Sequence, residues 1–185
     1  MGTRWRRLLG RKGFGWKPDP VDKRDWPFEK LGLSAQGLPS EANLAPGDLV
    51  LEHQGASSSC PGYSAAYCVG IRLAHEGSRY RQYAGLYPYW YARWIQGWEN
   101  IDEGAHIRDA CKALQRLGIP WVSWHPFSYR RINKRPSIMA DMQSHPIRGG
   151  KYVRIMDPVG TGKADAVKAA IAGGYPVQGG FALGP

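Results

Sequence analysis

The sequence predicts an α+β fold in which helices come first and strands follow. Between residues 60 and 118, apolar side chains recur at the spacing of helices. After Gly118, short runs rich in β-branched and aromatic residues take over, at residues 119–123, 151–156 and 176–183. Helical segments followed by strand segments are typical of α+β proteins in which the two kinds of element occupy separate regions.

The first predicted helix covers residues 60–76, and its apolar residues leave almost no polar face. A helix that is apolar on all sides is normally buried at the centre of a domain. Pro61 suits its first turn, because proline lacks an N–H that would have no intrahelical partner there. Gly77 would end the helix, since glycine readily takes the left-handed conformation that follows helix ends.

The sequence predicts further helices on both sides of the change at Gly118. Residues 88–97 begin with proline and carry several aromatic side chains. Residues 107–117 place apolar side chains on one stripe and charged ones on the other face, with Asp102 as the expected cap and Gly118 as the end. Residues 163–172 are expected to form a short alanine-rich helix.

The chain has 185 residues, which is enough for one domain with a real core or for two small lobes. Its formal net charge of +10 fits an acidic partner such as nucleic acid, an anionic polymer or an acidic subunit, and it fits a merely soluble basic surface equally well. Residues 1–14 form a basic tail that could contact such a partner or be a mobile, solvated tail. A second basic cluster could touch nucleic acid or be a solvated loop. Its residues are Arg130, Arg131, Lys134 and Arg135, near Tyr129 and Trp124.

The three cysteines are too few for a disulfide framework and lack the spacing of a zinc site. We therefore expect no metal and no cofactor, and free thiols are typical of a reducing compartment. The sequence has neither a secretory signal nor an apolar run long enough for a membrane span, so the expected location is the cytoplasm or a virion. Cys68 and Cys111 lie on apolar stripes and are predicted to be core thiols.

Cys60 differs from the other two cysteines, because it follows a polar loop and begins the first helix. The free N–H groups at a helix start favour thiolate over thiol, so Cys60 is a candidate nucleophile. Acyl transfer by a thiolate also needs an oxyanion hole, a histidine and a group that orients the histidine. Gln54 lies on the same loop, and its amide could share the oxyanion with the backbone N–H of Cys60.

With these residues the sequence resembles a known family. The stretch QGASSSCPGYS at residues 54–64 looks like the nucleophile loop of papain-like cysteine peptidases. The stretch GWKPD at 15–19, with DKRD at 22–25, resembles the opening of the bacterial and phage branch of that family, and DEGAHIR at 102–108 is similar to its "D.G..IR" motif. The resemblance covers essentially the whole chain from Gly15 onward. Further similar stretches lie at residues 38–44, 86–93, 118–127 and 164–181.

The resemblance implies a two-lobed papain-like fold, with a helical lobe followed by a partial β-barrel lobe. It divides the chain into a basic tail at 1–14, an N-terminal segment with the helical lobe at 15–118 and the start of the barrel lobe at 119–185. It also implies catalytic roles, in which Cys60 attacks a peptide carbonyl and Gln54 stabilises the oxyanion. Substrate next to the scissile bond would contact the backbone near Gly104, together with Glu103 and Ser59.

Three departures from the family pattern stand out. Ser57 occupies the position at which secreted members carry a disulfide cysteine, and Pro61 replaces the usual aromatic residue or threonine. The family's histidine and asparagine come in "GHA" and "NSWG" motifs beyond the strand that resembles residues 176–181, and neither motif is in this sequence. His106 is the best substitute among the five histidines, and without a base the chain is expected to be inactive or very slow.

The sequence therefore supports more than one function. The first is a cysteine peptidase that is active only if residues beyond Pro185 supply the histidine and asparagine. The alternative is a catalytically dead papain-like scaffold that serves as a structural or binding module, for example in a phage particle. A nucleic-acid-associated protein is a third possibility, which rests on charge alone. An open barrel lobe would expose a strand edge, so we expect a polypeptide substrate or a protein partner to cover it.

Overall fold

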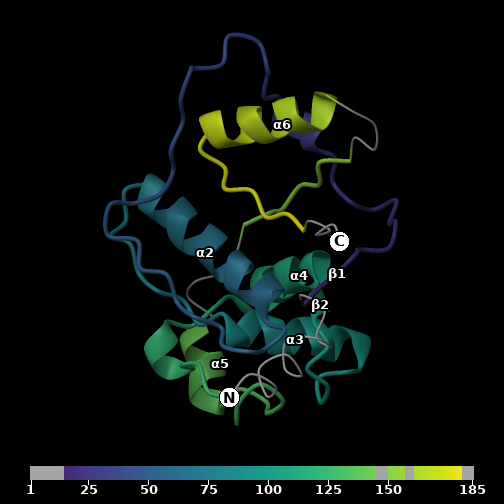
Figure 1. Ribbon diagram of the computed structural model, residues 1–185, viewed down its shortest axis with the longest axis vertical. Helices are drawn as coiled ribbons and strands as arrows, with labels where there is room; N and C mark the ends of the chain where they lie inside the picture. The colour runs from purple at the N-terminus through teal and green to yellow at the C-terminus, as the bar shows by residue number, and fades with distance from the viewer. Residues whose placement is uncertain (1–14, 145–149, 157–160, 181–185) are drawn as a thin grey trace, which may run out of the picture.

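The computed structural model describes residues 15–144, 150–156 and 161–180. These residues form a mixed structure with several helices and two very short strands, and three helices pack together in its middle (Figure 1). The α5 helix lies at one end of the molecule and α6 at the opposite end. The helices are α2 (Cys60–His75), α3 (Leu86–Gln96), α4 (Ile107–Leu117), α5 (Ile138–Ser144) and α6 (Thr161–Ala172).

The α2 helix begins at Cys60, as the sequence predicts, with Pro61 buried in its first turn. Its start packs very closely against the start of α3. A Cβ at Gly62 would lie 2.3 Å from the carbonyl oxygen of Gly85, so only glycine fits at this contact. The position of Cys60 is therefore fixed by the packing of two helices.

The α3 helix is the most deeply buried element, since each residue from Leu86 to Arg93 is buried. The fully buried Arg93 side chain stacks on the ring of Tyr89, with its guanidinium carbon 4.0 Å from the ring centroid. Its guanidinium also donates a hydrogen bond of 2.7 Å to the carbonyl of Ile101 and one of 2.8 Å to the side chain of Asn133. These hydrogen bonds offset the free-energy cost of burying the charged guanidinium.

The α4 helix is capped by a residue from far upstream. Asp19 Oδ1 accepts a hydrogen bond of 3.0 Å from the N–H of Arg108, in the first turn of α4. The prediction that Asp102 caps this helix is wrong, because the Asp102 carboxylate accepts the N–H of Ser58 instead. Gly118 follows the helix with a φ of 78°, as predicted for its end.

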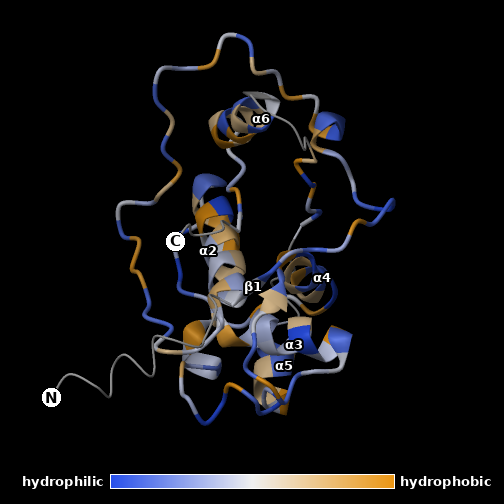
Figure 2. Ribbon diagram, turned by 45° about the vertical axis from the view of Figure 1, so that its right-hand side comes forward, coloured by the Kyte–Doolittle hydropathy of each residue, from blue (hydrophilic) through white to orange (hydrophobic). Residues whose placement is uncertain are grey.

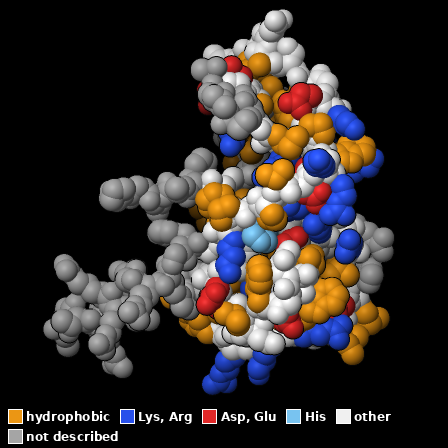
Figure 3. Space-filling view, turned by 90° about the vertical axis from the view of Figure 1, so that its right-hand side faces the viewer, with side chains coloured by type: hydrophobic (Ala, Val, Ile, Leu, Met, Phe, Trp, Pro, Cys, Tyr) orange, Lys and Arg blue, Asp and Glu red, His pale blue; other side chains and the backbone are white. Residues whose placement is uncertain are grey.

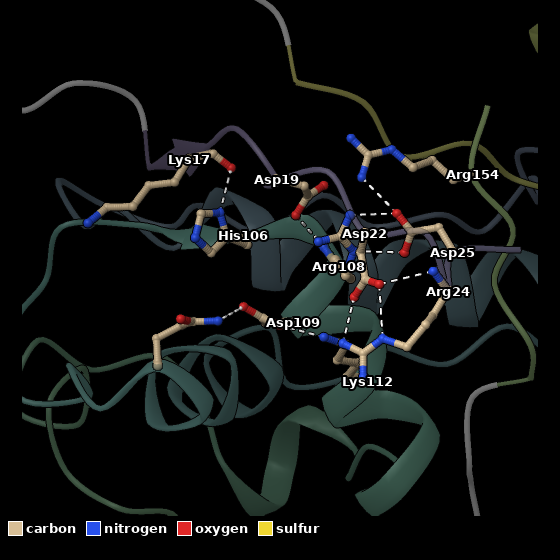
Figure 4. A network of polar contacts seen from close by, with 11 residues as sticks. Lys17, Asp19, Asp22, Arg24, Asp25, His106, Arg108, Asp109, Lys112 and Arg154 are labelled. Carbon is tan, nitrogen blue, oxygen red and sulfur yellow. Dashed lines mark hydrogen bonds and ion pairs between the residues drawn. The ribbon is translucent and has the colours of Figure 1, made fainter. Parts of the chain in front are cut away.

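A buried ion pair network fixes the segment before residue 26 (Figure 4). The Asp25 carboxylate accepts hydrogen bonds from Arg108 at 2.5 Å and from Arg154 at 2.9 Å. The side chains of Asp25 and Arg108 are only 3% and 6% exposed. Residues 22–25 and 102–108 thus meet in space and hold the N-terminal segment on α4.

The strands in the described residues differ from those that the sequence predicts. Two parallel strands are present, β1 (Trp16–Lys17) and β2 (Ala105–His106), and neither was predicted. The prediction of regular strands at 119–123 and 151–156 is wrong. Each of these segments makes only one isolated bridge, through Trp121 or Arg154, and a strand needs a partner along its length. The first of these segments runs into a short 3-10 helix, η2 (Val122–Trp124).

The predicted strand at 176–183 has no regular strand over residues 176–180, and its last three residues lie outside the described part of the chain. The second barrel lobe therefore stays a prediction. The helix predicted at 163–172 is confirmed as α6, two residues longer at its start. The α5 helix was not predicted, because its sequence is short and has no clear apolar stripe.

A separate apolar cluster joins the two ends of the described chain. Phe28, in the 3-10 helix η1 (Phe28–Leu31), packs with Ala169 and Ala170 of α6. Val153 lies against the same cluster. This contact crosses the expected boundary between residues 118 and 119, and the domain limits stay a prediction. The tail at 1–14 lies outside the described residues. The long connection between η1 and α2 mixes hydrophilic and hydrophobic residues (Figure 2).

Candidate active site

The loop before α2, which we call the nucleophile loop (residues 54–59), is a turn held by its own hydrogen bonds. Gln54 Nε2 donates to the carbonyl of Ser57 at 3.0 Å, and Ser57 Oγ donates to the carbonyl of Gln54 at 2.7 Å. The Ser57 and Ser59 hydroxyls lie 2.6 Å apart. Ser57 therefore braces the loop by hydrogen bonds at the position where the family resemblance places a disulfide cysteine.

This arrangement bears on two of the predicted site residues. The amide of Gln54 is bonded within the loop, so it must leave Ser57 before it can contact an oxyanion. Ser59 is fully buried, and its hydroxyl is bonded to Ser57. A contact between Ser59 and a substrate stays a prediction.

Cys60 lies at the first position of α2 and is partly buried. Burial raises the pKa of the Cys60 thiol, and this effect exceeds the opposite effect of the N–H groups of Gly15, Cys60 and Trp16. The prediction that the helix start favours thiolate is therefore wrong for this arrangement. The reason is that the sequence gives no sign of how strongly the sulfur is desolvated.

The β1 strand lies beside the Cys60 sulfur, since the N–H groups of Gly15 and Trp16 face it. Its backbone is joined to β2, because the carbonyl of Gly15 accepts the N–H of Ala105 at 2.8 Å. A Cβ at Gly15 would lie 1.7 Å from the carbonyl oxygen of Ser58, and a Cβ at Gly104 would lie 2.1 Å from the carbonyl oxygen of Gly15. The backbone near Gly104, which was predicted to pair with substrate, is here in contact with the protein's own N-terminal segment.

Side chains hold β1 at the same place. The Lys17 Nζ lies 4.5 Å from the ring centroid of Trp98 and 3.9 Å from a carboxylate oxygen of Glu103. The carbonyl of Lys17 is 3.2 Å from His106 Nδ1, so this ring nitrogen carries the proton in that contact (Figure 4). Glu103 and His106, both singled out from the sequence, therefore contact the strand beside the cysteine.

Tyr89 and Asp102 form a polar link that sequence reasoning missed. Asp102 Oδ1 accepts a hydrogen bond of 3.0 Å from the N–H of Ser58 and one of 2.7 Å from the Tyr89 hydroxyl. The Tyr89 oxygen in turn accepts the N–H of Gly104 at 3.1 Å. The link connects the nucleophile loop with the backbone near Gly104. Tyr89 sits within an aromatic run, and Asp102 fits a helix cap, so neither residue carried a signal of this role.

Gln178, which comes late in the sequence, also reaches the nucleophile helix. Its Nε2 donates to the carbonyl of Pro61 at 2.8 Å and lies 2.5 Å from Ser64 Oγ. Two residues further on, a Cβ at Gly180 would lie 2.1 Å from the indole of Trp16. The segment at 176–180 thus packs over both the start of α2 and the strand β1.

The other histidines are placed away from a catalytic role. His53 is exposed, and its Nδ1 accepts the N–H of Gly55 at 2.8 Å. His75 is exposed at the far end of α2. His125 is buried, and burial followed by the charge of Arg131 lowers its pKa to about 4. Among the described histidines, none has a hydrogen bond to Cys60, and His145 lies outside the described residues.

Tyr129, next to the basic cluster at residues 130–135, contributes one contact to the site. The Tyr129 hydroxyl accepts the N–H of Ala56 at 2.9 Å and so braces the nucleophile loop. Arg135 forms an exposed ion pair with Asp141 at 3.3 Å. One face of the molecule shows basic side chains scattered among hydrophobic and acidic ones (Figure 3). A contact of the basic cluster with nucleic acid stays a prediction.

Cys68 and Cys111 are free and partly buried. Burial raises their pKa values to about 11 and about 12, so both stay protonated near neutral pH. Cys68 borders a cavity of about 380 Å³ between α2 and the segment at 171–177. No helix in the described part of the chain is both long and apolar enough to cross a membrane.

Comparisons with known proteins give one informative match. No protein-family model matches the sequence, and no curated protein matches it. Among solved structures, the fold is similar to that of xylellain, a cysteine protease from Xylella fastidiosa, with a TM-score of 0.75 and 25% sequence identity. The match covers 89% of this chain and 64% of the xylellain chain. It supports a relationship with cysteine peptidases and fits an α+β fold.

Proposed function

We propose that this protein is a papain-like cysteine peptidase, in which Cys60 attacks the carbonyl carbon of a peptide bond. The observation that carries the proposal is the position of Cys60. It begins a helix whose first turns are largely buried, behind a braced polar loop, in a fold similar to that of a cysteine protease. The motifs at 15–25 and 102–108 resemble those of bacterial and phage peptidases of this family, so we propose that the protein belongs to that branch.

In the proposed reaction, the Cys60 thiolate adds to the carbonyl and the amine leaves with a proton. Water then hydrolyses the thioester and releases the acid. The oxyanion is bound by the backbone N–H of Cys60 and by the amide of Gln54, once that amide has left the carbonyl of Ser57. The bond that Gln54 Nε2 must give up is an ordinary hydrogen bond of 3.0 Å to the Ser57 carbonyl.

The reaction also needs a base that accepts the thiol proton and passes it to the leaving amine. We propose that a histidine, oriented by an asparagine, comes from a barrel lobe that begins near residue 119 and includes polypeptide outside this sequence. Support comes from the described histidines, none of which is bonded to Cys60. His106 is the substitute within the chain, since it lies on β2 beside the strand that contacts the cysteine.

The proposal is tested on the protein with its complete barrel lobe, using fluorogenic peptides and a peptidyl vinyl sulfone, which alkylates an active thiol. We expect the vinyl sulfone to label Cys60, and Cys60→Ala to lose both label and turnover. The control Cys68→Ala changes a partly buried thiol away from the site and should leave both unchanged. Gln54→Ala should lower turnover by about 10²–10³, the usual effect of losing one oxyanion donor. Hydrolysis that survives Cys60→Ala would exclude Cys60 as the nucleophile.

A second function, the catalytically dead scaffold, is favoured by the raised pKa of Cys60 and by the strand beside its sulfur. Such a module would bind an extended polypeptide, for example in a phage particle, without cleaving it. Binding of a peptide without turnover, and without vinyl sulfone label even in the presence of the complete barrel lobe, would favour this function. The free thiols suit a reducing compartment, so we propose a cytoplasmic or virion location in either case.

A further inference from the structure

We propose that residues 129–142 form an exosite, a docking surface beside the nucleophile loop, for substrate polypeptides in which apolar residues lie among acidic ones. The inference rests on the proposed function, whose substrate class it names. It is carried by three features of these residues, which are the apolar outer side of α5, the exposed cations that precede α5 and the contact of Tyr129 with the nucleophile loop.

The outer side of α5 is apolar. Ile138 is 72% exposed, Met142 is 60% exposed and Met139 is 49% exposed. Ile138 and Met142 are four residues apart, so they are neighbours on one side of the helix. The inner side carries Ala140 and Ser144, which are fully buried against α3. Apolar side chains gathered in water and bordered by polar ones mark a contact surface, and methionine adapts its shape to a partner.

Exposed cations come directly before this apolar side in the chain. Arg130, Arg131 and Lys134 are all exposed, and none of them forms an ion pair with another described residue. A ligand that carries carboxylates would therefore meet cations that are not already neutralised. Complementary charge of this kind gives specificity for a partner and speeds its association.

Asp141 does not neutralise these three cations. It is the only acidic residue between residues 121 and 144. One oxygen of its carboxylate accepts the hydroxyl of Tyr91 at 2.6 Å and that of Tyr87 at 3.0 Å, and the other oxygen pairs with Arg135 at 3.3 Å. The Asp141 charge is thus used to hold α5 on α3, and it leaves the exosite basic.

The loop that carries the cations is fixed from within. The buried Arg93 guanidinium donates to the carbonyl of Ile132 and to the side chain of Asn133, the latter at 2.8 Å. Ile132 itself is buried, and the N–H of Lys134 donates to the carbonyl of Arg131 at 3.1 Å. A backbone that is already ordered loses little conformational entropy when a ligand binds.

Tyr129 joins the exosite to the nucleophile loop. Its hydroxyl accepts the N–H of Ala56 at 2.9 Å, and a Cβ at Gly55 would lie 2.2 Å from the same oxygen. Tyr129 is nevertheless 60% exposed. A polypeptide on the exosite would therefore pass beside the loop that carries Gln54 and leads to Cys60.

The combination of features favours a polypeptide over a nucleic acid. The phosphates of a nucleic acid would pair with the cations, but its flat bases stack on aromatic rings rather than on aliphatic side chains. Ile138, Met139 and Met142 would then stay uncovered. A polypeptide in which leucine or methionine lies among aspartate and glutamate satisfies the cations and covers the apolar side.

The experiment measures binding by fluorescence anisotropy to the full chain with Cys60→Ala, which cannot cleave the probe. The probe is a fluorescein-labelled peptide of repeated Leu-Glu-Glu triplets. We expect Arg130→Gln/Arg131→Gln/Lys134→Gln to weaken binding about tenfold or more and to reduce its dependence on salt. The same peptide with glutamine in place of glutamate should bind much more weakly, and equal binding of the two peptides would overturn the inference.

The matched control removes three positive charges outside the exosite. It is Lys23→Gln/Lys163→Gln/Lys168→Gln, which changes exposed residues, two of them on α6 at the opposite end of the molecule from α5 (Figure 1). We expect this control to bind the probe as tightly as the parent does. An equal loss of affinity in the control and in the exosite variant would show that only net charge matters, and the exosite would be excluded.

A second variant tests the apolar side. Ile138→Ser/Met142→Ser leaves the cations in place, and we expect it to weaken binding of the probe about tenfold, because apolar area is no longer buried. Unchanged affinity in this variant would contradict the role of α5. An oligothymidylate or an anionic lipid vesicle that binds the parent more tightly than the probe does would overturn the choice of a polypeptide.

Binding needs no catalysis, so the outcome separates this inference from the proposed function. Probe binding at the exosite of a complete protein that has no turnover would contradict the peptidase and leave the exosite in place. In an active protein, a fluorogenic substrate extended by the probe sequence should have a KM about tenfold lower than the unextended substrate, with a similar kcat. Equal KM values for the two substrates would exclude the exosite and leave the peptidase in place.

Discussion

The hydroxyl of Tyr89 and the carboxylate of Asp102 lie 2.7 Å apart and join two parts of the site that are distant in sequence. Asp102 holds the N–H of Ser58, two residues before the cysteine, and Tyr89 holds the N–H of Gly104. Burial raises the pKa of Tyr89, so its hydroxyl stays protonated and can act as donor and acceptor at once. Cys60 and the edge that faces it are thus kept in a fixed relation.

Tyr89→Phe tests this link. The change leaves the Gly104 N–H and one acceptor position of Asp102 without their partner, which we expect to cost about 1–3 kcal/mol of unfolding free energy. Urea unfolding measures this change in unfolding free energy. The control Tyr129→Phe removes a hydroxyl that also braces the nucleophile loop, but at an exposed position where water replaces it. An equal loss of unfolding free energy in the two variants would show that burial of the link does not increase its contribution to stability.

Asp25→Asn tests the buried ion pair network. The change leaves the Arg108 guanidinium, which is 6% exposed, without its anionic partner, and breaking such a pair typically costs about 3–5 kcal/mol. Thermal unfolding should show a large drop in Tm. Asp22→Asn is the matched control, since Asp22 forms its ion pair with the exposed Arg24. A Tm that falls equally in both variants would contradict the importance of burial.

His125 predicts a pH dependence of stability. Its pKa is about 4 in the folded protein, below the ordinary value of 6.5, so the unfolded chain binds the proton more readily. The nearby Asp141 opposes this effect only in part. Stability is therefore lost as pH falls from about 6.5 to about 4, by up to about 3 kcal/mol at 1.36 kcal/mol for each pKa unit.

The measurement is unfolding free energy at several pH values for the parent and for His125→Phe. The variant should lack this part of the pH dependence, whereas His53→Gln, at an exposed position, should retain it. In the described part of the chain, His125 Nε2 is a buried atom without a hydrogen-bond partner, which is why the neutral ring is favoured. Parallel pH curves for parent and His125→Phe would contradict this assignment.

Gly62→Ala tests the close approach of α2 and α3. The new methyl group would lie 2.3 Å from the carbonyl oxygen of Gly85, which is backbone and cannot rotate away, so the helices must shift. Overpacking of this kind typically costs about 1–3 kcal/mol. The control Gly47→Ala adds a methyl group where no atom lies within 4 Å. Denaturant unfolding measures both, and unchanged stability of Gly62→Ala would show that the contact is loose.

Sequence reasoning located α2, α3, α4 and α6, because the spacing of apolar residues and the glycines at helix ends are local signals. It also identified the loop that carries Cys60. It did not foresee that Asp102 is bonded to Tyr89, because a hydrogen bond between distant residues leaves no periodic trace. The pKa of Cys60 was mispredicted for a related reason, since the burial that raises it comes from tertiary packing, which leaves no local pattern in the sequence.

The strand predictions were wrong for a different physical reason. Residues 151–156 alternate as a strand does, yet pairing is a property of two segments, and only Arg154 finds a bridge partner in Pro27. Conversely, β1 and β2 are too short to leave a pattern in the sequence. The resemblance to family motifs predicted more here than strand propensity did, because such motifs reflect contacts with distant residues as well as local conformation.

The Asp25 network also bears on the order in which the chain is completed during synthesis. Asp25 is made early, Arg108 becomes available after α4 has begun, and Arg154 lies 129 residues downstream of Asp25. Contacts of large sequence separation form late, whereas α2, α3 and α4 are close in sequence and can associate first. The Asp25 network is therefore expected to be complete only after α2, α3 and α4 have associated, which makes it a late contact that locks an already packed set of helices.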